Sequence, residues 1–182
     1  MARLPYLDKN ALSPENQDLD RPENNLYRVL NNSPNCSRIA QRMADFVFKG
    51  SRLDGRLKEF AIMAVAYLAR VPYAWSHHLT IRKNYGVSDE DVRQLINALD
   101  RRSHTLDERA GLVVAAAREM TEDLAISDKT FAALRGFLDN EALVDLVVII
   151  GHYNGMGRVL RTLEIDVEAD YLPPLEEFPL PA

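Results

Sequence analysis

The sequence predicts an all-α, single-domain helical bundle. Apolar residues recur three and four positions apart along most of the 182 residues, which is the spacing of one face of a helix. Alternating apolar and polar runs, which indicate strands, are almost absent. The length also favours one domain, since single domains commonly have ~100–200 residues. We expect an N-terminal arm over residues 1–22, a helical domain over 23–165 and an extended C-terminal tail over 166–182.

Seven or eight helices are expected, separated by residues that favour helix ends. The expected segments are residues 24–32, 33–50, 53–72, 73–85, 88–99, 106–123, 127–138 and 141–163. Several begin at side chains suited to capping a helix N-terminus, namely Asp54, Ser88, Ser127 and either Asp139 or Asn140. The stretch "SDED" from Ser88 is similar to a capping box. Others end at residues that stop a helix, namely Gly50, Pro72 and Gly86.

Three segments have features that predict how they pack. Residues 60–68 are apolar on nearly every side, so we expect their helix at the centre of the core. Gly151, Gly155 and Gly157 each cost a helix about 1 kcal/mol, which predicts that this part of the last helix packs closely against a neighbouring backbone. The tail contains four prolines and is expected to be an extended strap in an apolar groove, on this subunit or on another.

Composition argues against several classes of protein. A net charge of -5 disfavours non-specific nucleic-acid binding, which depends on clustered Lys and Arg. The single cysteine, Cys36, allows no internal disulfide, so we expect a reducing compartment and a small buried side chain there. No signal-peptide run is present, and no stretch reaches the ~20 apolar residues of a membrane span. We therefore expect a soluble cytoplasmic protein whose partners include neither nucleic acid nor a membrane.

The stretch "VPYAWSHHLTIRKNYG", residues 71–86, contains two of the four histidines side by side. On a helix, His78 lies over the same face as Trp75, whereas His77 points about 100° away. Glu59 lies at the start of the apolar core helix, where a carboxylate costs several kcal/mol unless it has a partner. A histidine on the following helix is the natural partner, and such a pair fixes the imidazole tautomer and raises its basicity. The pattern predicts a general acid–base site formed by His78 and Glu59.

Other interpretations of these residues stay open. His77 and His78 can be one surface residue and one hydrogen-bonded core residue. His152 and Tyr153, in the stretch "GHYNGMG", interrupt an apolar helix and are further candidates for the site. A metal site of His78, His152 and Glu59 is chemically possible, but no tight ligand motif supports it. We expect neither a metal nor another cofactor.

The stretch "LKEFAIMAVAYLARVPYAWSHHLTIRKNYGVSDEDV" closely resembles the core of the carboxymuconolactone decarboxylase and alkylhydroperoxidase D-like superfamily. Its pattern runs from a glutamate on a long apolar helix through Tyr-x-Trp-x-x-His to Gly-Val-Ser. The matching positions are Glu59, Tyr73, Trp75, His78, Gly86, Val87 and Ser88. The resemblance implies an all-α fold and assembly into a homo-oligomer, as a dimer, trimer or hexamer.

The resemblance also bears on function. In the peroxidase branch, two cysteines stand where this chain has Val71 and Ala74. No disulfide cycle can run without those thiols, because the thiolate is the nucleophile. Many members also carry a glutamate at the position of Ala74, so this chain lacks a possible second carboxylate.

The decarboxylase branch uses no cysteine pair. By its resemblance, His78 would supply a proton and Glu59 would tune its basicity. Tyr73, Trp75 and Tyr153 would form an apolar substrate wall, with His152 as a further binding residue. The leading hypothesis is a lyase or isomerase acting on a lactone or organic acid from aromatic breakdown. The alternatives are an alkylhydroperoxidase-type redox protein, and a non-catalytic oligomeric ligand-binding protein in which Glu and His only satisfy each other.

Overall fold

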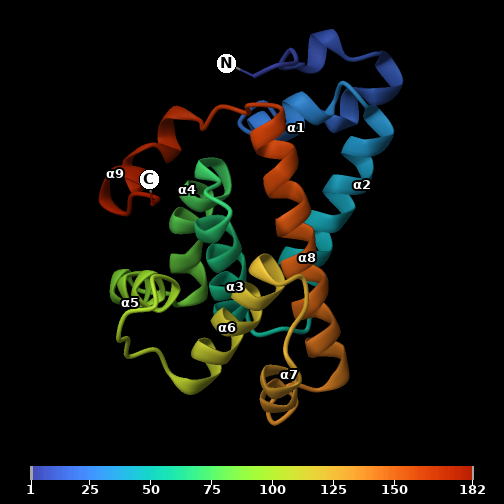
Figure 1. The fold of residues 1–182 in the computed structure, drawn as a ribbon. Coiled ribbons are helices and arrows are strands. Elements are labelled where there is room, and N and C mark those ends of the chain that lie inside the picture. The colour runs from blue at the N-terminus through green and yellow to red at the C-terminus, as the bar shows by residue number, and fades with distance from the viewer. Residues whose placement is uncertain (1, 182) are drawn as a thin grey trace.

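The computed structural model describes residues 2–181, and these fold into helices and turns without any strand (Figure 1). The helices are α1 Asn25–Leu30, α2 Pro34–Asp45, α3 Gly55–Leu68, α4 Pro72–Ile81, α5 Asp89–Leu99, α6 Glu108–Glu122, α7 Asp128–Leu134, α8 Asn140–Thr162 and α9 Pro173–Glu177. Short 3-10 turns occupy Lys9–Ala11, Pro14–Leu19, Arg82–Tyr85 and Ala169–Tyr171, and a wider π turn follows α2 at Phe46–Gly50. The predicted all-α fold class is confirmed.

Helix α3 is the centre of the core, as its apolar pattern predicts. Every residue from Leu57 to Tyr67 is buried, and α4, α6 and α8 pack around them. The side chain of Asp54 accepts a hydrogen bond from the backbone N–H of Leu57, so the predicted cap is confirmed. Pro72 does not end this helix. The helix ends at Leu68, and the chain changes direction at Arg70, which has a φ of 52°. Pro72 is the first residue of the next helix, α4, where a missing N–H has no cost.

The other predicted caps are also present. Ser88 and Asp91 form a complete capping box at α5, and Ser127 and Asp139 cap α7 and α8. Gly86 has a φ of 74°, a left-handed conformation that glycine adopts without strain, and it ends the turn that follows α4. Local chemistry therefore sets most of the element boundaries.

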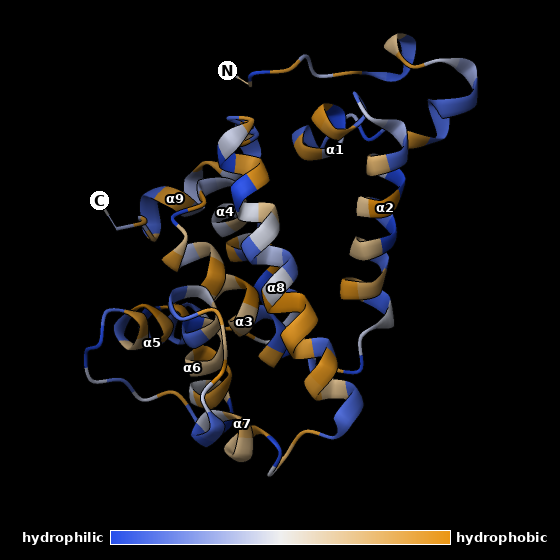
Figure 2. Cartoon of the chain, turned by 45° about the vertical axis from the view of Figure 1, so that its right-hand side comes forward, coloured by the Kyte–Doolittle hydropathy of each residue, from blue (hydrophilic) through white to orange (hydrophobic). Residues whose placement is uncertain are grey.

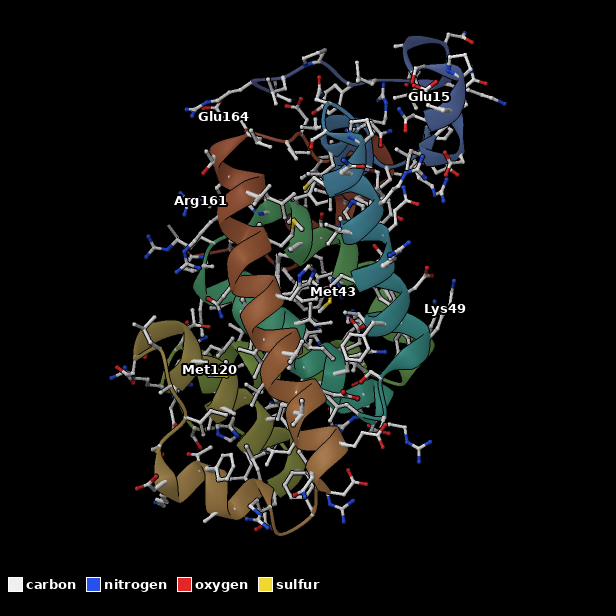
Figure 3. All side chains as sticks on the ribbon, turned by 90° about the vertical axis from the view of Figure 1, so that its right-hand side faces the viewer. Glu15, Met43, Lys49, Met120, Arg161 and Glu164 are labelled. Atoms are coloured by element: carbon white, nitrogen blue, oxygen red, sulfur yellow. The ribbon has the colours of Figure 1, made fainter. Side chains whose placement is uncertain are left out.

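Helices α1 and α2 stand beside α8 and cover the face of the bundle where α4 meets α8. The hydrophobic residues of α2 lie on its side toward α8 (Figure 2), and Met43 lies between the two helices (Figure 3). The N-terminal arm crosses the end of α8, where the N–H of Arg3 donates to the carbonyl of Leu163 at 2.9 Å. The hydroxyl of Tyr6 donates to Asp166 at 2.8 Å, which ties the arm to the tail.

The tail is not extended throughout, so that part of the expectation is wrong. It contains a 3-10 turn and helix α9, because Pro173 and Pro174 occupy the first helical positions, where proline is tolerated. The tail lies on α4 of its own chain. The side chain of Phe178 is buried, and its carbonyl accepts a 2.7 Å hydrogen bond from Nε1 of Trp75.

Only one of the three glycines of α8 has the predicted close neighbour. A Cβ atom at Gly157 would lie 3.0 Å from Cγ2 of Val71, so glycine lets α8 approach the α3–α4 connection. Gly151 and Gly155 are exposed and have open space where a Cβ atom would be, so for them the expectation is wrong.

By length and composition alone, α8 is apolar enough to cross a membrane, with a mean hydropathy of 1.2, although the sequence suggested no such stretch. Core helices of soluble proteins have the same length and composition, and 39% of this apolar window is buried inside the fold.

Candidate active site

Consecutive helices bring Glu59 of α3 and His78 of α4 into direct contact. Nδ1 of His78 lies 2.8 Å from Oε2 of Glu59, and the two side chains are buried. A carboxylate only accepts hydrogen bonds, so Nδ1 carries a proton, and in the tautomer with its one proton there Nε2 has the free lone pair. The other carboxylate oxygen, Oε1, is buried without a hydrogen-bond partner among residues 2–181. Glu59 therefore depends on His78 for its one hydrogen bond.

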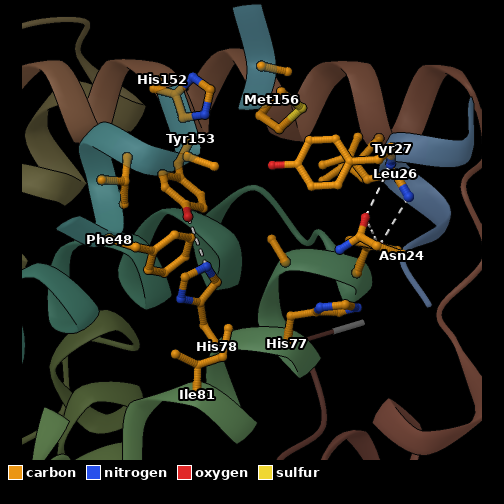
Figure 4. Close-up of a pocket in the computed structure, with 16 residues that line it drawn as sticks. Asn24, Leu26, Tyr27, Phe48, His77, His78, Ile81, His152, Tyr153 and Met156 are labelled. Atoms are coloured by element: carbon orange, nitrogen blue, oxygen red, sulfur yellow. Dashed lines mark hydrogen bonds between the residues drawn. The ribbon is translucent and has the colours of Figure 1, made fainter. Parts of the chain in front are cut away.

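A third side chain, Tyr153 of α8, contacts this pair. Its hydroxyl lies 3.0 Å from Nε2 of His78, to which it donates when Nδ1 holds the only proton of the ring, and the two rings meet edge to face (Figure 4). Burial raises the pKa of Tyr153 well above its ordinary value, and the nearby carboxylate of Glu59 raises it further. The hydroxyl therefore keeps its proton at neutral pH, and the three side chains form a relay from Tyr153 through His78 to Glu59.

His78 and Tyr153 face a cavity of about 150 Å³ that is lined by α1, α2, the π turn after α2, α4 and α8. Its walls are mostly apolar or aromatic. They are formed by Asn24, Leu26, Tyr27, Ala40, Ala44, Val47, Phe48, Tyr73, Ala74, His77, His78, Ile81, His152, Tyr153, Met156 and Leu160. Figure 4 shows the hydroxyl of Tyr27 pointing into this space from the side opposite His78 and Tyr153. The cavity has the form of a small-ligand site, largely apolar with a few polar groups.

Four of the six predicted site residues line this cavity, Glu59 lies behind them in contact with His78, and Trp75 lies elsewhere. Tyr73 and His152 line the wall together with His78 and Tyr153. Trp75 does not, so its expected place in the substrate wall is wrong. It is fully buried on the other side of α4, against Tyr67 and the carbonyl of Phe178. At ~100° per residue, Trp75 lies about 100° from Ala74 and about 160° from His77, both of which line the cavity, so its side chain points away from the cavity.

His77 belongs to a second cluster, which joins the tail to α4. Its ring is stacked between those of Tyr73 and Tyr171, with centroids 4.3 and 3.8 Å away, and Nε2 lies 2.8 Å from Oε2 of Glu168. Glu168 also accepts from the Tyr73 hydroxyl and from the backbone N–H of Asn25. Burial raises the pKa of Glu168, but these hydrogen bonds outweigh it and lower the pKa overall. His77 is thus a structural neighbour of the site.

Within residues 2–181, no three His, Cys, Asp or Glu side chains are placed to hold a metal ion. His152, one ligand of the metal site considered above, packs edge to face on Tyr153 at 5.4 Å. Burial lowers the pKa of His152, so it is neutral near pH 7.

Cys36 is exposed on α2 and does not line the cavity, which corrects the expectation of a buried side chain. Its buried neighbour Ser37 takes the inward position instead, where its hydroxyl donates to Asn31. The positions of the two peroxidase cysteines are filled by Val71, which is buried, and Ala74, which lines the cavity. The structure therefore offers no thiol beside His78.

Sequence analysis missed three residues that matter to the site: Tyr27, Phe48 and Glu168. Phe48 stacks over His78 at 6.2 Å, and Tyr27 supplies the facing hydroxyl. A signal in the sequence exists only for Tyr27, which lies inside the short amphipathic segment 24–32. The pattern of that segment does not show which part of the fold it packs against.

Three comparisons with known proteins bear on the identity of the chain. The model of the carboxymuconolactone decarboxylase family matches residues 34–119. A search of curated proteins gives no match. Among solved structures, the alkylhydroperoxidase AhpD core of a peroxidase-related protein from Ralstonia eutropha JMP134 is similar at a TM-score of 0.78. It is 17% identical, and the match covers 93% of this chain and 94% of that one.

Two further crystal structures share the fold. A peroxidase-related protein from Silicibacter sp. TM1040 is 18% identical, with a TM-score of 0.68 over 79% of this chain and 78% of that one. A cysteine-to-alanine variant of the debrominase Bmp8, in complex with 2,3,4-tribromopyrrole, is 18% identical, with a TM-score of 0.71 over 90% of this chain and 86% of that one. Residues 34–119, somewhat under half of the chain, are thus similar to the carboxymuconolactone decarboxylase family, and the chain as a whole shares the all-α fold of these alkylhydroperoxidase D-like structures.

Proposed function

We propose that this protein is a small-molecule lyase or isomerase that transfers protons through His78 and Glu59, with a lactone or related organic acid as substrate. The observation that carries the proposal is the 2.8 Å hydrogen bond between the two side chains at the wall of a cavity. A buried carboxylate that orients an imidazole, whose second nitrogen faces a ligand site, is the arrangement of a general base.

The chemistry uses Nε2 of His78 as the base. It takes a proton from a carbon next to a carbonyl group, and the electron pair of that C–H bond moves to the carbonyl oxygen as an enolate. The imidazolium stays hydrogen-bonded to Glu59, and the same proton returns to another carbon to give the isomer. In a lyase reaction, the C–C bond to a carboxylate breaks, its electron pair moves into the enolate and carbon dioxide leaves; the His78 ring, which has first taken a proton from solvent at Nε2, then gives that proton to the enolate carbon. General acid–base groups of this kind contribute about 10²–10⁴-fold in rate.

Tyr153 is suited to a second role in this reaction, as a hydrogen-bond donor to the substrate. Its hydroxyl donates to Nε2 at 3.0 Å in the structure and is kept protonated by burial. When a substrate takes its place at Nε2, the hydroxyl becomes a donor for the oxygen on which charge develops. A neutral donor aimed at that oxygen stabilises the enolate without adding charge to the cavity.

The two alternative functions have less support. Peroxidase chemistry needs thiols where Val71 and Ala74 stand, and Cys36 lies outside the cavity. A non-catalytic role would leave Glu59 and His78 sealed among packed side chains, whereas His78 lines a cavity. The fold neighbour Bmp8 binds a small halogenated ring, and the cavity here is of a size to hold a small ring as well.

Hydrogen–deuterium exchange tests the proposal at the proton-transfer step itself, whatever the final product is. A panel of five- and six-membered lactones and their hydroxy acids is incubated with the protein in D₂O, and loss of the C–H signal next to the carbonyl is followed by NMR. We expect catalysed exchange that His78→Gln lowers about 100-fold or more and Glu59→Gln also lowers. His104→Gln, at an exposed histidine, is the matched control and should exchange like wild type. Exchange unaffected by His78→Gln, or absent across the panel, would refute the proposal.

A further inference from the structure

The cavity beside His78 has no charged wall residue of its own. None of its lining residues, all within the described range, is Asp, Glu, Lys or Arg. Lys58 of α3 is buried nearby but does not line the cavity, because its ammonium donates to the carbonyl of Val47 and lies over the rings of Phe48 and Tyr85. An anionic ligand would therefore lose its hydration without gaining a fixed cation.

The histidines of the wall do not supply the missing charge. His78 and His77 each already have a carboxylate, Glu59 and Glu168, at 2.8 Å. An imidazolium at either position would be neutralised by its own partner. His152 has no such partner, but burial lowers its pKa and keeps it neutral. The carboxylate of Glu59 lies directly behind His78, so the nearest full charge at the reacting end repels an anion.

The size and walls of the cavity fit one planar ring. Its volume is about 150 Å³, and a cavity of roughly that size lined by apolar side chains is known to take up benzene. Phe48, Tyr27 and Tyr153 present aromatic surface, and Ile81 and Met156 add apolar surface to the wall. A molecule with a second ring or a long chain would not be enclosed.

Two hydroxyl groups mark where a polar atom of the ligand would lie. Tyr153 and Nε2 of His78 form one end, and the Tyr27 hydroxyl points into the cavity from the other (Figure 4). The Tyr27 hydroxyl makes no hydrogen bond within residues 2–181, and burial raises its pKa, so it is a neutral donor without a partner. A carbonyl or hydroxyl oxygen on a bound ring would satisfy it.

We infer that the site selects an uncharged single-ring molecule with a carbonyl or hydroxyl group, and that Tyr27 holds this oxygen while carboxylate anions are excluded. This inference rests on the proposed function, because it names the substrate class of the same site. It favours the lactone over the organic acid, and proton-transfer isomerisation over loss of carbon dioxide from a free carboxylate.

Binding of the isosteric pair benzamide and benzoate tests the charge selection directly. Dissociation constants are measured near pH 7.5 by NMR titration of the full chain, with phenol as a second neutral probe. We expect benzamide and phenol to bind, and benzoate to bind at least about tenfold more weakly. Benzoate binding as tight as benzamide, or no binding of either neutral probe, would overturn the inference.

Two further variants locate the ligand in this cavity. Tyr27→Phe should raise the dissociation constant of benzamide about three- to tenfold. Tyr6→Phe should leave it unchanged, because the Tyr6 hydroxyl donates a hydrogen bond to Asp166 away from the cavity. Met156→Lys replaces the thioether side chain by one of similar length that ends in an ammonium group. This variant should bind benzoate more tightly than benzamide, whereas Met156→Leu should not. An unchanged preference in Met156→Lys would show that the probes bind elsewhere and would overturn the inference.

The outcomes separate this inference from the proposed function. If the protein binds benzamide in preference to benzoate but catalyses no deuterium exchange, the inferred binding site stands and the proposed enzymatic function is refuted. If exchange depends on His78 but is faster with carboxylate substrates than with matched lactones, the proposed enzymatic function stands and the inferred selection of uncharged ligands is refuted.

Discussion

Replacing His78 by leucine should destabilise the fold by more than the change in packing explains. Glu59 is completely buried, its Oε2 bonds to His78, and its Oε1 has no partner among residues 2–181. Leucine is similar in size to the imidazole, so it fills the space but leaves the carboxylate unpaired. Removing one partner of a buried charge pair costs about 3–5 kcal/mol, and we expect a loss of that size in the free energy of unfolding near pH 7.5.

The loss should shrink in acid, and the sign follows from proton linkage. A buried carboxylate without a partner binds its proton more tightly in the folded than in the unfolded chain. The folded variant therefore holds more protons than the unfolded one at neutral pH, and its stability falls as the pH rises. Urea unfolding followed by circular dichroism near pH 5 and near pH 7.5 measures the difference. The variant should lie closer to wild type at the lower pH.

A double variant is the control for this reasoning. Glu59→Leu combined with His78→Leu removes the buried charge together with its partner, which in other proteins is often neutral or stabilising. The double variant should recover most of the stability that the single His78→Leu variant loses at pH 7.5. An equal loss at both pH values, or no recovery in the double variant, would show that Glu59 is not the source of the instability.

Three more outcomes are expected. Phe178→Ala should cost about 3 kcal/mol of unfolding free energy in a urea titration, because it empties a buried site and loosens the tail on α4; an unchanged midpoint would mean that the tail does not stabilise the domain. Hydrogen bonds hold the pKa of Glu168 below its ordinary value despite burial. Its contribution to stability is therefore present at neutral pH and lost as the pH falls through that lowered pKa. Glu168→Gln should lower the melting temperature at pH 7 and flatten its acid dependence, and an unaltered acid profile would contradict this. Cys36 should react fully with a thiol reagent such as DTNB in the native protein, since it is exposed, and Cys36→Ser should leave catalysed exchange unchanged; a thiol that reacts only after unfolding, or lost exchange, would contradict its placement.

Local chemistry in the sequence determined much of this molecule. The apolar run before Leu68 predicted the buried helix α3. Asp54, Ser88 and Ser127 predicted three helix starts, and a fourth was predicted at Asp139 or Asn140 and lies at Asp139. These predictions succeed because a cap needs only backbone atoms within a few residues of itself. The pairing of Glu59 with His78 was predictable for the same kind of reason. The two residues lie on consecutive helices joined by a short turn, and a buried carboxylate requires a partner.

Tertiary structure alone decided what surrounds that pair. Tyr27 reaches the cavity from α1 and Glu168 reaches His77 from the tail, across 91 residues of sequence in the second case. Trp75 has the spacing of a site residue but turns into the core, because the tail covers that side of α4. The spacing of residues along one helix fixes which face they share, but not which segment packs on that face. The sequence therefore determined the hydrogen-bonded pair of Glu59 and His78, and the packing of α1, α2, α8 and the tail decided the shape and the uncharged walls of the cavity beside it.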